Sequence, residues 1–334
     1  MGDHDSLFKR TFSVPAHAAG ELRSVLPPSL TSKIDLESLE LVPSSFVDPH
    51  LSHRHADLLF TARIGGRSAC VYFLFEHQSE PDPLMPWRVL EYMNRIWAAA
   101  LQKDPARTML PPIVTVVVHH GARGWTAPRS FHEVVDGLDA APELRAFVPD
   151  FELAIDDLAT ADDTELHGRP LAAFPKVTLW LLRDIRTLHA VREHLAAWAD
   201  ELSRLVLDDP TRNDCETVLR YIRRVLGDES YEEIRELVIE VAPIFGEAMP
   251  TVEQLIEKAR EEARAEARAE ARAEARAEAR GEFAREMLGT LLRSRFGTVD
   301  SQTEQRVAAG STADVERWLQ RAMVAARIED VFGD

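Results

Sequence analysis

Two carboxylates and one amide in the first third of the chain could bind a divalent metal ion on a single β-hairpin. Two strand-like runs, 56–64 and 67–78, are separated only by Gly65-Gly66. A tight primed turn needs positive φ at both central residues, so a Gly-Gly pair between two such runs is a strong hairpin signal. We therefore expect an antiparallel pair of strands in which Ile64 lies opposite Arg67.

An uninterrupted register from this turn sorts the side chains of the hairpin onto two faces. It places Asp57 opposite Leu74, with Glu76 as the diagonal neighbour of Asp57 and Gln78 further along the same line. Diagonal residues lie about 7–8 Å apart at the backbone, which lets two carboxylates reach one ion. A slip by one residue would mix the two faces, so the alternation supports the pairing. The other face is uniformly apolar and holds Leu58, Phe60, Ala62, Ile64, Ala69, Val71, Phe73 and Phe75.

Two acids on one hairpin face suit a hard cation. Mg²⁺ prefers oxygen ligands and keeps several water molecules with which it can meet a substrate phosphate. Such an ion polarises a phosphoryl oxygen and helps to deprotonate an attacking water molecule. The alternative is an acid pair on a solvated sheet edge, although the apolar neighbours Leu74 and Phe75 make an ordinary edge less natural.

Three sequence motifs in a fixed order carry a resemblance to a known family. Together they resemble the Rpn family of recombination-promoting nucleases, also described as putative transposases, within the PD-(D/E)XK nuclease superfamily. The resemblance covers residues 3–210, and the C-terminal part resembles a small domain of unknown function often appended to such proteins. The motifs are His4-Asp5-x-x-Phe8-Lys9-x-x-Phe12, Glu76-His77-Gln78-Ser79-x-x-Asp82 and Met85-Pro86-x-Arg88-x-x-x-Tyr92.

The resemblance implies a restriction-endonuclease-like fold and divalent-metal cleavage of DNA. By matching positions, Asp57 and Glu76 would bind Mg²⁺ or Mn²⁺, and Gln78 would orient water or the scissile phosphate. This chain departs from the family pattern at Gln78, where lysine is the usual residue. Because glutamine is neutral, it cannot stabilise developing charge as lysine can, which predicts slow turnover or a stronger dependence on the metal.

Side chains on two predicted helices are further candidates for contact with DNA or metal. Asp5 is a possible accessory metal contact, and Lys9 a phosphate contact, but the same spacing also fits an ion pair on a helix surface. Arg88 and Tyr92 share one face of the helix that follows the hairpin, where they could hold phosphate and stack on a sugar or base. A solvated helix face is the alternative for this pair.

The order of elements predicts a mixed α/β core. Helical spacing at the N-terminus is followed by the hairpin, by a helix that begins near Pro86 and by a buried strand at 113–118. The fold class is a restriction-endonuclease-like mixed sheet flanked by helices, followed by an all-α region with a long charged helix. The expected parts are a nuclease-like domain (1–210), a helical extension (211–250), an Ala-Glu-Ala-Arg helix or linker (251–281) and a small helical module (282–334).

The Ala-Glu-Ala-Arg repeat predicts a long helix by propensity. Its period of four stacks glutamate over glutamate and arginine over arginine, which gives like-charge neighbours and no apolar seam. A solvated linker is one interpretation. The other is a homo-oligomer formed through the helix at 252–282, with the glutamate row of one chain facing the arginine row of another.

Charge restricts how the chain could bind nucleic acid. The net charge is -17, which opposes non-specific DNA binding by the molecule as a whole. Residues 126–250 hold 26 acidic and 13 basic side chains, whereas residues 1–125 hold 13 and 12. DNA is therefore expected as a partner only where basic groups gather locally. The lack of a long apolar run and the two cysteines predict a cytoplasmic protein with no membrane segment.

Two other functions stay open. One is a protein of DNA mobility, related to transposases, which would need a third acid on an RNase H-like sheet. The other is a nuclease-like scaffold without catalytic activity. Metal-dependent nicking of plasmid DNA separates these alternatives from an endonuclease.

Overall fold

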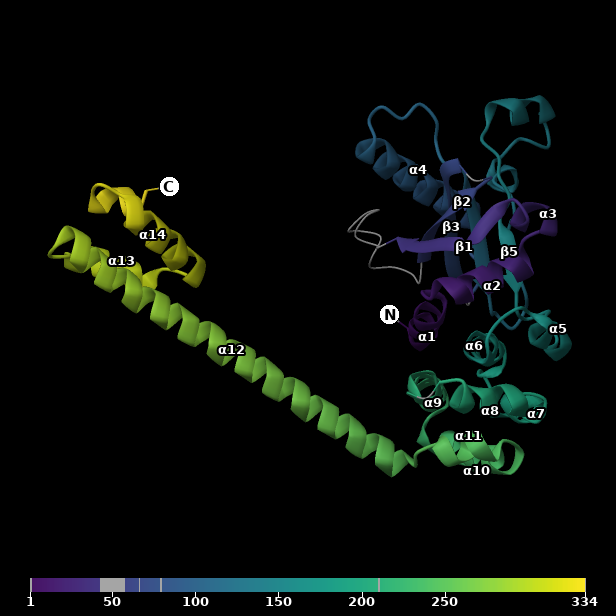
Figure 1. Cartoon of the computed structure of the whole chain (residues 1–334). Helices are drawn as coiled ribbons and strands as arrows, with labels where there is room; N and C mark the ends of the chain where they lie inside the picture. Colours follow the sequence, from purple (N-terminus) through teal and green to yellow (C-terminus); the bar gives the residue numbers. More distant parts are fainter. Residues whose placement is uncertain (1, 43–57, 66, 79, 210, 334) are drawn as a thin grey trace. The chain divides into compact units, whose positions relative to one another are not determined.

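The computed structural model describes residues 2–42, 58–65, 67–78, 80–209 and 211–333, and for the strand at 67–78 it describes the main chain. The chain forms two compact units, Met1–Val252 and Glu253–Asp334. Figure 1 labels the helices and strands of both units. In the described part of the chain, no helix is both long enough and apolar enough to cross a membrane.

The first unit is built around one five-stranded mixed sheet. The strands follow one another in chain order across the sheet. The first three form an antiparallel meander, whereas β4 runs parallel to β3 and β5 parallel to β4. A mixed α/β fold is therefore confirmed. The strands are β1 (Ile34–Val42), β2 (Leu58–Ile64), β3 (Arg67–Gln78), β4 (Ile113–His119) and β5 (Ala154–Asp157).

The β2–β3 hairpin confirms the expected turn and corrects the register beyond it. Ile64 pairs with Arg67, and Gly65 has the positive φ of 58° that the turn requires. The next pair is Arg63 with Cys70, so the ladder shifts by two residues at an irregularity. A shift of two keeps every residue on its expected face, because the side-chain period of a strand is two.

This shift changes which residues lie opposite each other at the far end of the hairpin. Leu74 pairs with Leu59, so the expected pairing of Leu74 with Asp57 is wrong. The last described pair of the ladder is Leu58 with Phe75. Asp57 itself lies outside the described residues.

Helices cover both faces of the sheet (Figure 1). On one face, Met85, Val89 and Met93 of α4 pack against Val117 of β4. On the other face α2 packs against β1 and β5. The helix expected at the N-terminus is confirmed by α1, and α2 follows it from Pro15. These elements are α1 (Asp3–Phe12), α2 (Pro15–Val25), α3 (Pro28–Thr31) and α4 (Met85–Lys103).

A helical layer completes the first unit. Its largest buried side chains are Trp180, Trp198, Tyr231 and Phe245. The Trp180 and Trp198 rings stack with their centroids 5.2 Å apart. The helices are α5 (Asp163–Gly168), α6 (Ala173–Asp184), α7 (Leu188–His194), α8 (Ala199–Leu207), α9 (Asn213–Leu226), α10 (Asp228–Val241) and α11 (Pro243–Ala248), preceded by the 3-10 turns η3 (His132–Val134) and η4 (Pro142–Phe147).

The second unit has its own apolar core. The repeat is helical, as predicted, and belongs to one helix, α12 (Val252–Phe296), which continues through Gly281. A Cβ on Gly281 would lie 2.8 Å from Thr312 Oγ1, so the glycine permits close packing of α12 on α14. Ser311 caps α14 by accepting a hydrogen bond from Asp314 N. The remaining elements are α13 (Ser301–Ala309), α14 (Thr312–Val324) and η5 (Ile328–Val331).

The charged rows of α12 do not form a straight stripe. Four residues turn an α-helix by about 400°, so each row advances by about 40° around the helix with every repeat. Two such helices could match opposite rows at a crossing but not along their full lengths. Association of two chains through residues 252–282 stays a prediction.

Candidate active site

The expected catalytic residues belong to the far end of the hairpin. Asp57 lies outside the described residues, and for Glu76 and Gln78 the main chain alone is described. Glu76 pairs with Val117, and Gln78, the last residue of β3, pairs with His119, the last residue of β4. The carboxyl ends of these two parallel strands therefore meet at one edge of the sheet.

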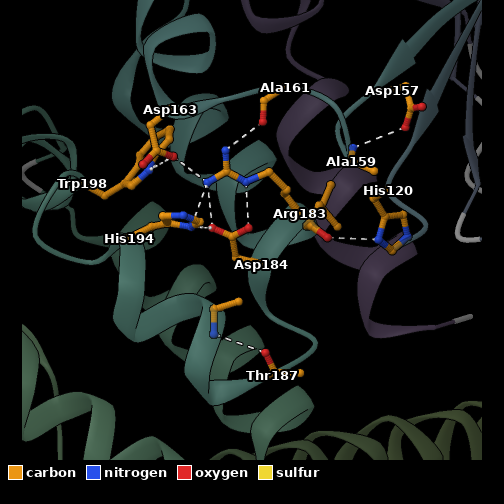
Figure 2. A network of polar contacts seen from close by, with 12 residues as sticks. His120, Asp157, Ala159, Ala161, Asp163, Arg183, Asp184, Thr187, His194 and Trp198 are labelled. Carbon is orange, nitrogen blue, oxygen red and sulfur yellow. Dashed lines mark hydrogen bonds and ion pairs between the residues drawn. The ribbon is translucent and has the colours of Figure 1, made fainter. Parts of the chain in front are cut away.

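A third strand ends at the same edge and brings an acid that the sequence did not single out. His119 pairs with Asp157, the last residue of β5. One carboxylate oxygen of Asp157 accepts a hydrogen bond from Trp125 N at 2.7 Å. The other accepts one from Ala159 N at 3.3 Å, which Figure 2 shows. Gln78, His119 and Asp157 thus occupy successive register positions across three parallel strands.

The loop after β4 closes over this edge. Gly121 N donates a hydrogen bond to His119 Nε2 at 3.2 Å, and the His119 and Trp125 rings meet edge to face at 5.4 Å. Gly124 has a φ of 70°, and a Cβ there would come within 3.0 Å of Asp157 Oδ2. The loop is therefore held by Asp157 on one side and by the fully buried His119 on the other.

The second and third motifs of the sequence meet at the start of α4. Asp82 Oδ2 lies 3.0 Å from Arg88 Nη1, and Asp82 Oδ1 accepts a hydrogen bond from Leu84 N at 2.9 Å. Arg88 Nη2 in turn donates to Tyr92 Oη at 3.4 Å. Asp82 therefore orients Arg88, and Arg88 contacts Tyr92, which gives these motif residues a shared structural role whether or not they also touch DNA.

The first motif lies on α1. Asp5 Oδ2 accepts a hydrogen bond from Gly2 N at 3.2 Å, so this acid helps to satisfy the start of the helix. Lys9, one turn later, is partly exposed. The expected accessory metal role of Asp5 and the phosphate role of Lys9 stay predictions.

A histidine of α1 connects this helix to the end of β4 and to α9. The His4 ring lies 5.0 Å from the ring of His120, the residue that follows β4. His4 Nδ1 is 2.6 Å from Tyr221 Oη. Burial raises the pKa of Tyr221, with a smaller contribution from Asp3, so the phenol keeps its proton.

A polar network behind His120 fixes the helical layer (Figure 2). Leu182 O lies 3.1 Å from His120 Nδ1. Next to it on α6, Arg183 donates to both carboxylate oxygens of Asp184 at 2.7 Å and to Asp163 at 2.5 Å. His194 Nδ1 lies 2.6 Å from Asp184 Oδ2.

Opposite charges face each other in this network. Burial alone would raise the pKa of Asp163, but hydrogen bonds from Trp198 and Arg183 outweigh it and lower the pKa. Arg183 is therefore paired on two sides. The network joins α5, α6, α7 and α8 and has no side chain suited to attack a substrate, so we assign it a structural role.

No metal-binding cluster is found in the described part of the chain: no three His, Cys, Asp or Glu side chains there could hold one ion. The expected ligands Asp57 and Glu76 fall outside that search. Oxygen donors from two carboxylates would suit Mg²⁺ or Mn²⁺, and Asp157 is a described acid that shares the register row of Gln78.

Comparisons with known proteins define the class of this molecule. The family model described as "Putative transposase, YhgA-like" matches residues 2–212, and the chain belongs to this family. The resemblance predicted from the three motifs is thereby confirmed. No solved structure gives a significant match.

Named relatives include both nucleases and proteins described as inactive. Over 238 residues, 71% of this chain and 86% of the relative, the chain is 26% identical to the recombination-promoting nuclease RpnD of Escherichia coli O157:H7. It is 32% identical over 120 residues, 35% of this chain and 40% of the relative, to the recombination-promoting nuclease RpnA of Escherichia coli K12. It is 24% identical over 259 residues, 76% of this chain and 81% of the relative, to the inactive recombination-promoting nuclease-like protein RpnE of the same strain.

Proposed function

We propose that this chain is a divalent-metal-dependent DNA endonuclease that promotes recombination, built on a restriction-endonuclease-like core. Asp57 and Glu76 bind Mg²⁺ or Mn²⁺, and Gln78 orients water or the scissile phosphate. When bound, the ion polarises the phosphate and lowers the pKa of a water molecule. Support comes from the family, from relatives named as nucleases and from the order of helix, meander, helix and parallel strand.

One observation supports a shared metal site more than any other. Leu58 pairs with Phe75 at the end of the hairpin ladder. In the sequence, Asp57 directly precedes Leu58 and Glu76 directly follows Phe75. With the two-residue shift, the chain neighbours of the two acids form a direct cross-strand pair. An uninterrupted hairpin would have placed the two acids as diagonal neighbours.

The residues around this end of the sheet have supporting roles in the proposal. Gln78 donates its amide N–H to a phosphate oxygen or accepts from the attacking water. Asp157 holds the loop of Gly121 to Trp125 by its hydrogen bond to Trp125 N. Arg88, oriented by Asp82, neutralises a phosphate of the bound DNA strand.

Nicking of supercoiled plasmid by the full chain tests the proposal. We expect nicking with Mg²⁺ or Mn²⁺, none with EDTA, and background levels for Asp57→Ala and for Glu76→Ala. The matched control is Glu40→Ala, because Glu40 is an exposed acid of the neighbouring strand β1. Full activity in Asp57→Ala would overturn the assignment.

A second candidate is a nuclease-like scaffold without catalysis. It is favoured by the neutral Gln78 and by the relative that is named inactive. Absence of nicking with either metal, together with retained binding of DNA, would establish this candidate instead.

A further inference from the structure

A groove between α1 and α9 is lined by more positive than negative side chains. Its volume is about 350 Å³. The two helices run in opposite directions, since Asp3 at the start of α1 lies 3.3 Å from Arg224 near the end of α9. The charged residues that line it are Asp3, Arg10, Glu216, Arg220 and Arg224.

We propose that this groove binds the phosphate backbone of a nucleic acid strand. It would be a second contact, separate from the hairpin. Its role as a track for the substrate of the hairpin site rests on the proposed endonuclease function.

Two of the three arginines are available to a ligand. Arg224 is engaged by Asp3. Arg10 and Arg220 are exposed, and among the described residues neither makes an ion pair or a side-chain hydrogen bond. A guanidinium group presents several N–H donors in a fixed fork that matches phosphate oxygens. The groove therefore offers two donor groups with the right geometry for phosphate.

The length of the groove fits an extended strand. Its lining on α9 extends from Asn213 to Arg224, about 17 Å along the helix axis. On α1 it extends from Asp3 to Arg10, about 10 Å. The buried side chains of Leu7 and Tyr221 contribute to the lining between these rims.

The groove is connected to the edge of the sheet that carries the candidate active site. Tyr221 lines the groove and is hydrogen-bonded to His4. His4 contacts the ring of His120, whose carbonyl oxygen accepts a hydrogen bond from the exposed Arg186 at 2.6 Å. His120 directly follows His119, the register partner of Gln78. These contacts link the groove, through His4, to the residue that follows the register partner of Gln78.

The overall charge sharpens the proposal. The chain carries a net charge of -17, so nucleic acid can be held only by local groups of basic residues. Removing such a group should weaken binding and its dependence on salt. Raising the salt concentration fourfold weakens binding by about 3.5-fold for each phosphate that the protein neutralises.

The test measures binding of a short fluorescein-labelled DNA duplex to the full chain by anisotropy, in EDTA so that no cleavage occurs. The double variant Arg10→Gln, Arg220→Gln should lose about two phosphate contacts. A fourfold rise in salt concentration should therefore weaken duplex binding by a factor about 12-fold smaller in this variant than in the wild type. The control, Arg145→Gln with Arg204→Gln, makes the same change in net charge at two exposed arginines elsewhere in the unit.

A substitution that should strengthen binding is a control for misfolding, because a misfolded variant would not bind the duplex more tightly. Asp3→Asn releases Arg224 from its ion pair and should tighten binding of the duplex. Inorganic pyrophosphate serves as the small-anion probe. Pyrophosphate binding that depends on Arg10 and Arg220, with duplex binding unchanged, would overturn the proposal, as would equal losses in the variant and its control.

Cleavage assays separate this proposal from the endonuclease assignment. Weaker duplex binding by the double variant, with no nicking by the wild type, would support the groove and refute the nuclease. Wild-type nicking together with unchanged binding and nicking in the double variant would refute the groove alone.

Discussion

Asp156 and Asp157 are neighbours in β5, yet they have different surroundings because adjacent strand residues point to opposite faces of the sheet. Asp156 is buried and receives two hydrogen bonds from Arg169, each 2.8 Å long. Asp157 is partly exposed and binds main-chain N–H groups of two loops. One acid therefore stabilises the core, whereas the other shapes the edge of the candidate active site.

Asp156, the buried acid of this pair, belongs to an ion cluster that joins β5, α2 and α5. Arg169 lies 2.8 Å from Glu21 of α2 and 3.0 Å from Glu165 of α5. Gly20 permits the close approach, because a Cβ there would come within 2.6 Å of Pro170 O. Breaking such a buried cluster leaves uncompensated charge, whereas loosening a surface loop costs less.

The largest effect should follow from Arg169→Ala. This change leaves Asp156 and Glu21 buried without their guanidinium partner, so we expect a loss of about 3–5 kcal/mol in the free energy of unfolding. Urea denaturation of the full chain followed by circular dichroism measures it. Arg145→Ala, at an exposed position, is the control. A loss below about 1 kcal/mol would show that the cluster does not hold the core.

The second prediction concerns pH and the same cluster. Burial raises the pKa of Glu21 well above its ordinary value of 4.5, and the charge of Asp156 raises it further, although Arg169 opposes both. The folded state thus binds a proton that the unfolded state loses near pH 4.5. Stability should fall as the pH rises from there through the raised pKa, by at most about 1.4 kcal/mol per pH unit.

Glu21→Gln tests this pH dependence. The neutral amide has no proton to lose, so the decline should be smaller in the variant than in the wild type. Glu37→Gln, at an exposed acid of β1, leaves the wild-type profile unchanged. Identical profiles for Glu21→Gln and wild type over this range would contradict the prediction.

Substitution of Asp157, the partly exposed acid of the pair, should affect activity more than stability. Asp157→Ala removes the acceptor for Trp125 N and Ala159 N, so the loop after β4 loosens at a cost of about 1–3 kcal/mol. Plasmid nicking should fall clearly, because the loop borders the register position of Gln78. A variant with normal nicking would remove Asp157 from the candidate site.

The elements that could be predicted from the sequence are those whose apolar residues keep one spacing along the whole element. The helices α1 and α4 and the buried strand β4 were expected near their observed positions. Strand β1 was missed because its alternation breaks at Ser38, where the ladder between β1 and β2 shifts. Ser38 Oγ accepts a hydrogen bond from Arg63 N at 2.9 Å and so replaces a main-chain contact.

The parts that were not predicted depend on contacts between distant segments. The two-residue shift in the hairpin leaves no trace in the alternation, because both registers give the same faces. Asp157 belongs to a strand of four residues, too short and too acidic to stand out. Its place beside His119 follows only from the parallel pairing of β4 and β5.

The smallest expected effect is that of Gln78→Lys. Gln78 ends β3, so its main chain is held by the pairing with His119 whatever the side chain, and stability should change by less than about 0.5 kcal/mol. Lysine is the residue that the resemblance to PD-(D/E)XK nucleases predicts at this position, and it would add a cation that stabilises developing charge on the phosphate, which favours nicking. The same cation beside the metal opposes ion binding, so more Mg²⁺ would be needed. Nicking rates against Mg²⁺ concentration separate the two effects: we expect a maximal rate equal to or above that of the wild type and a midpoint at higher Mg²⁺. A lower maximal rate with an unchanged midpoint would mean that the amide of Gln78 itself is required for positioning.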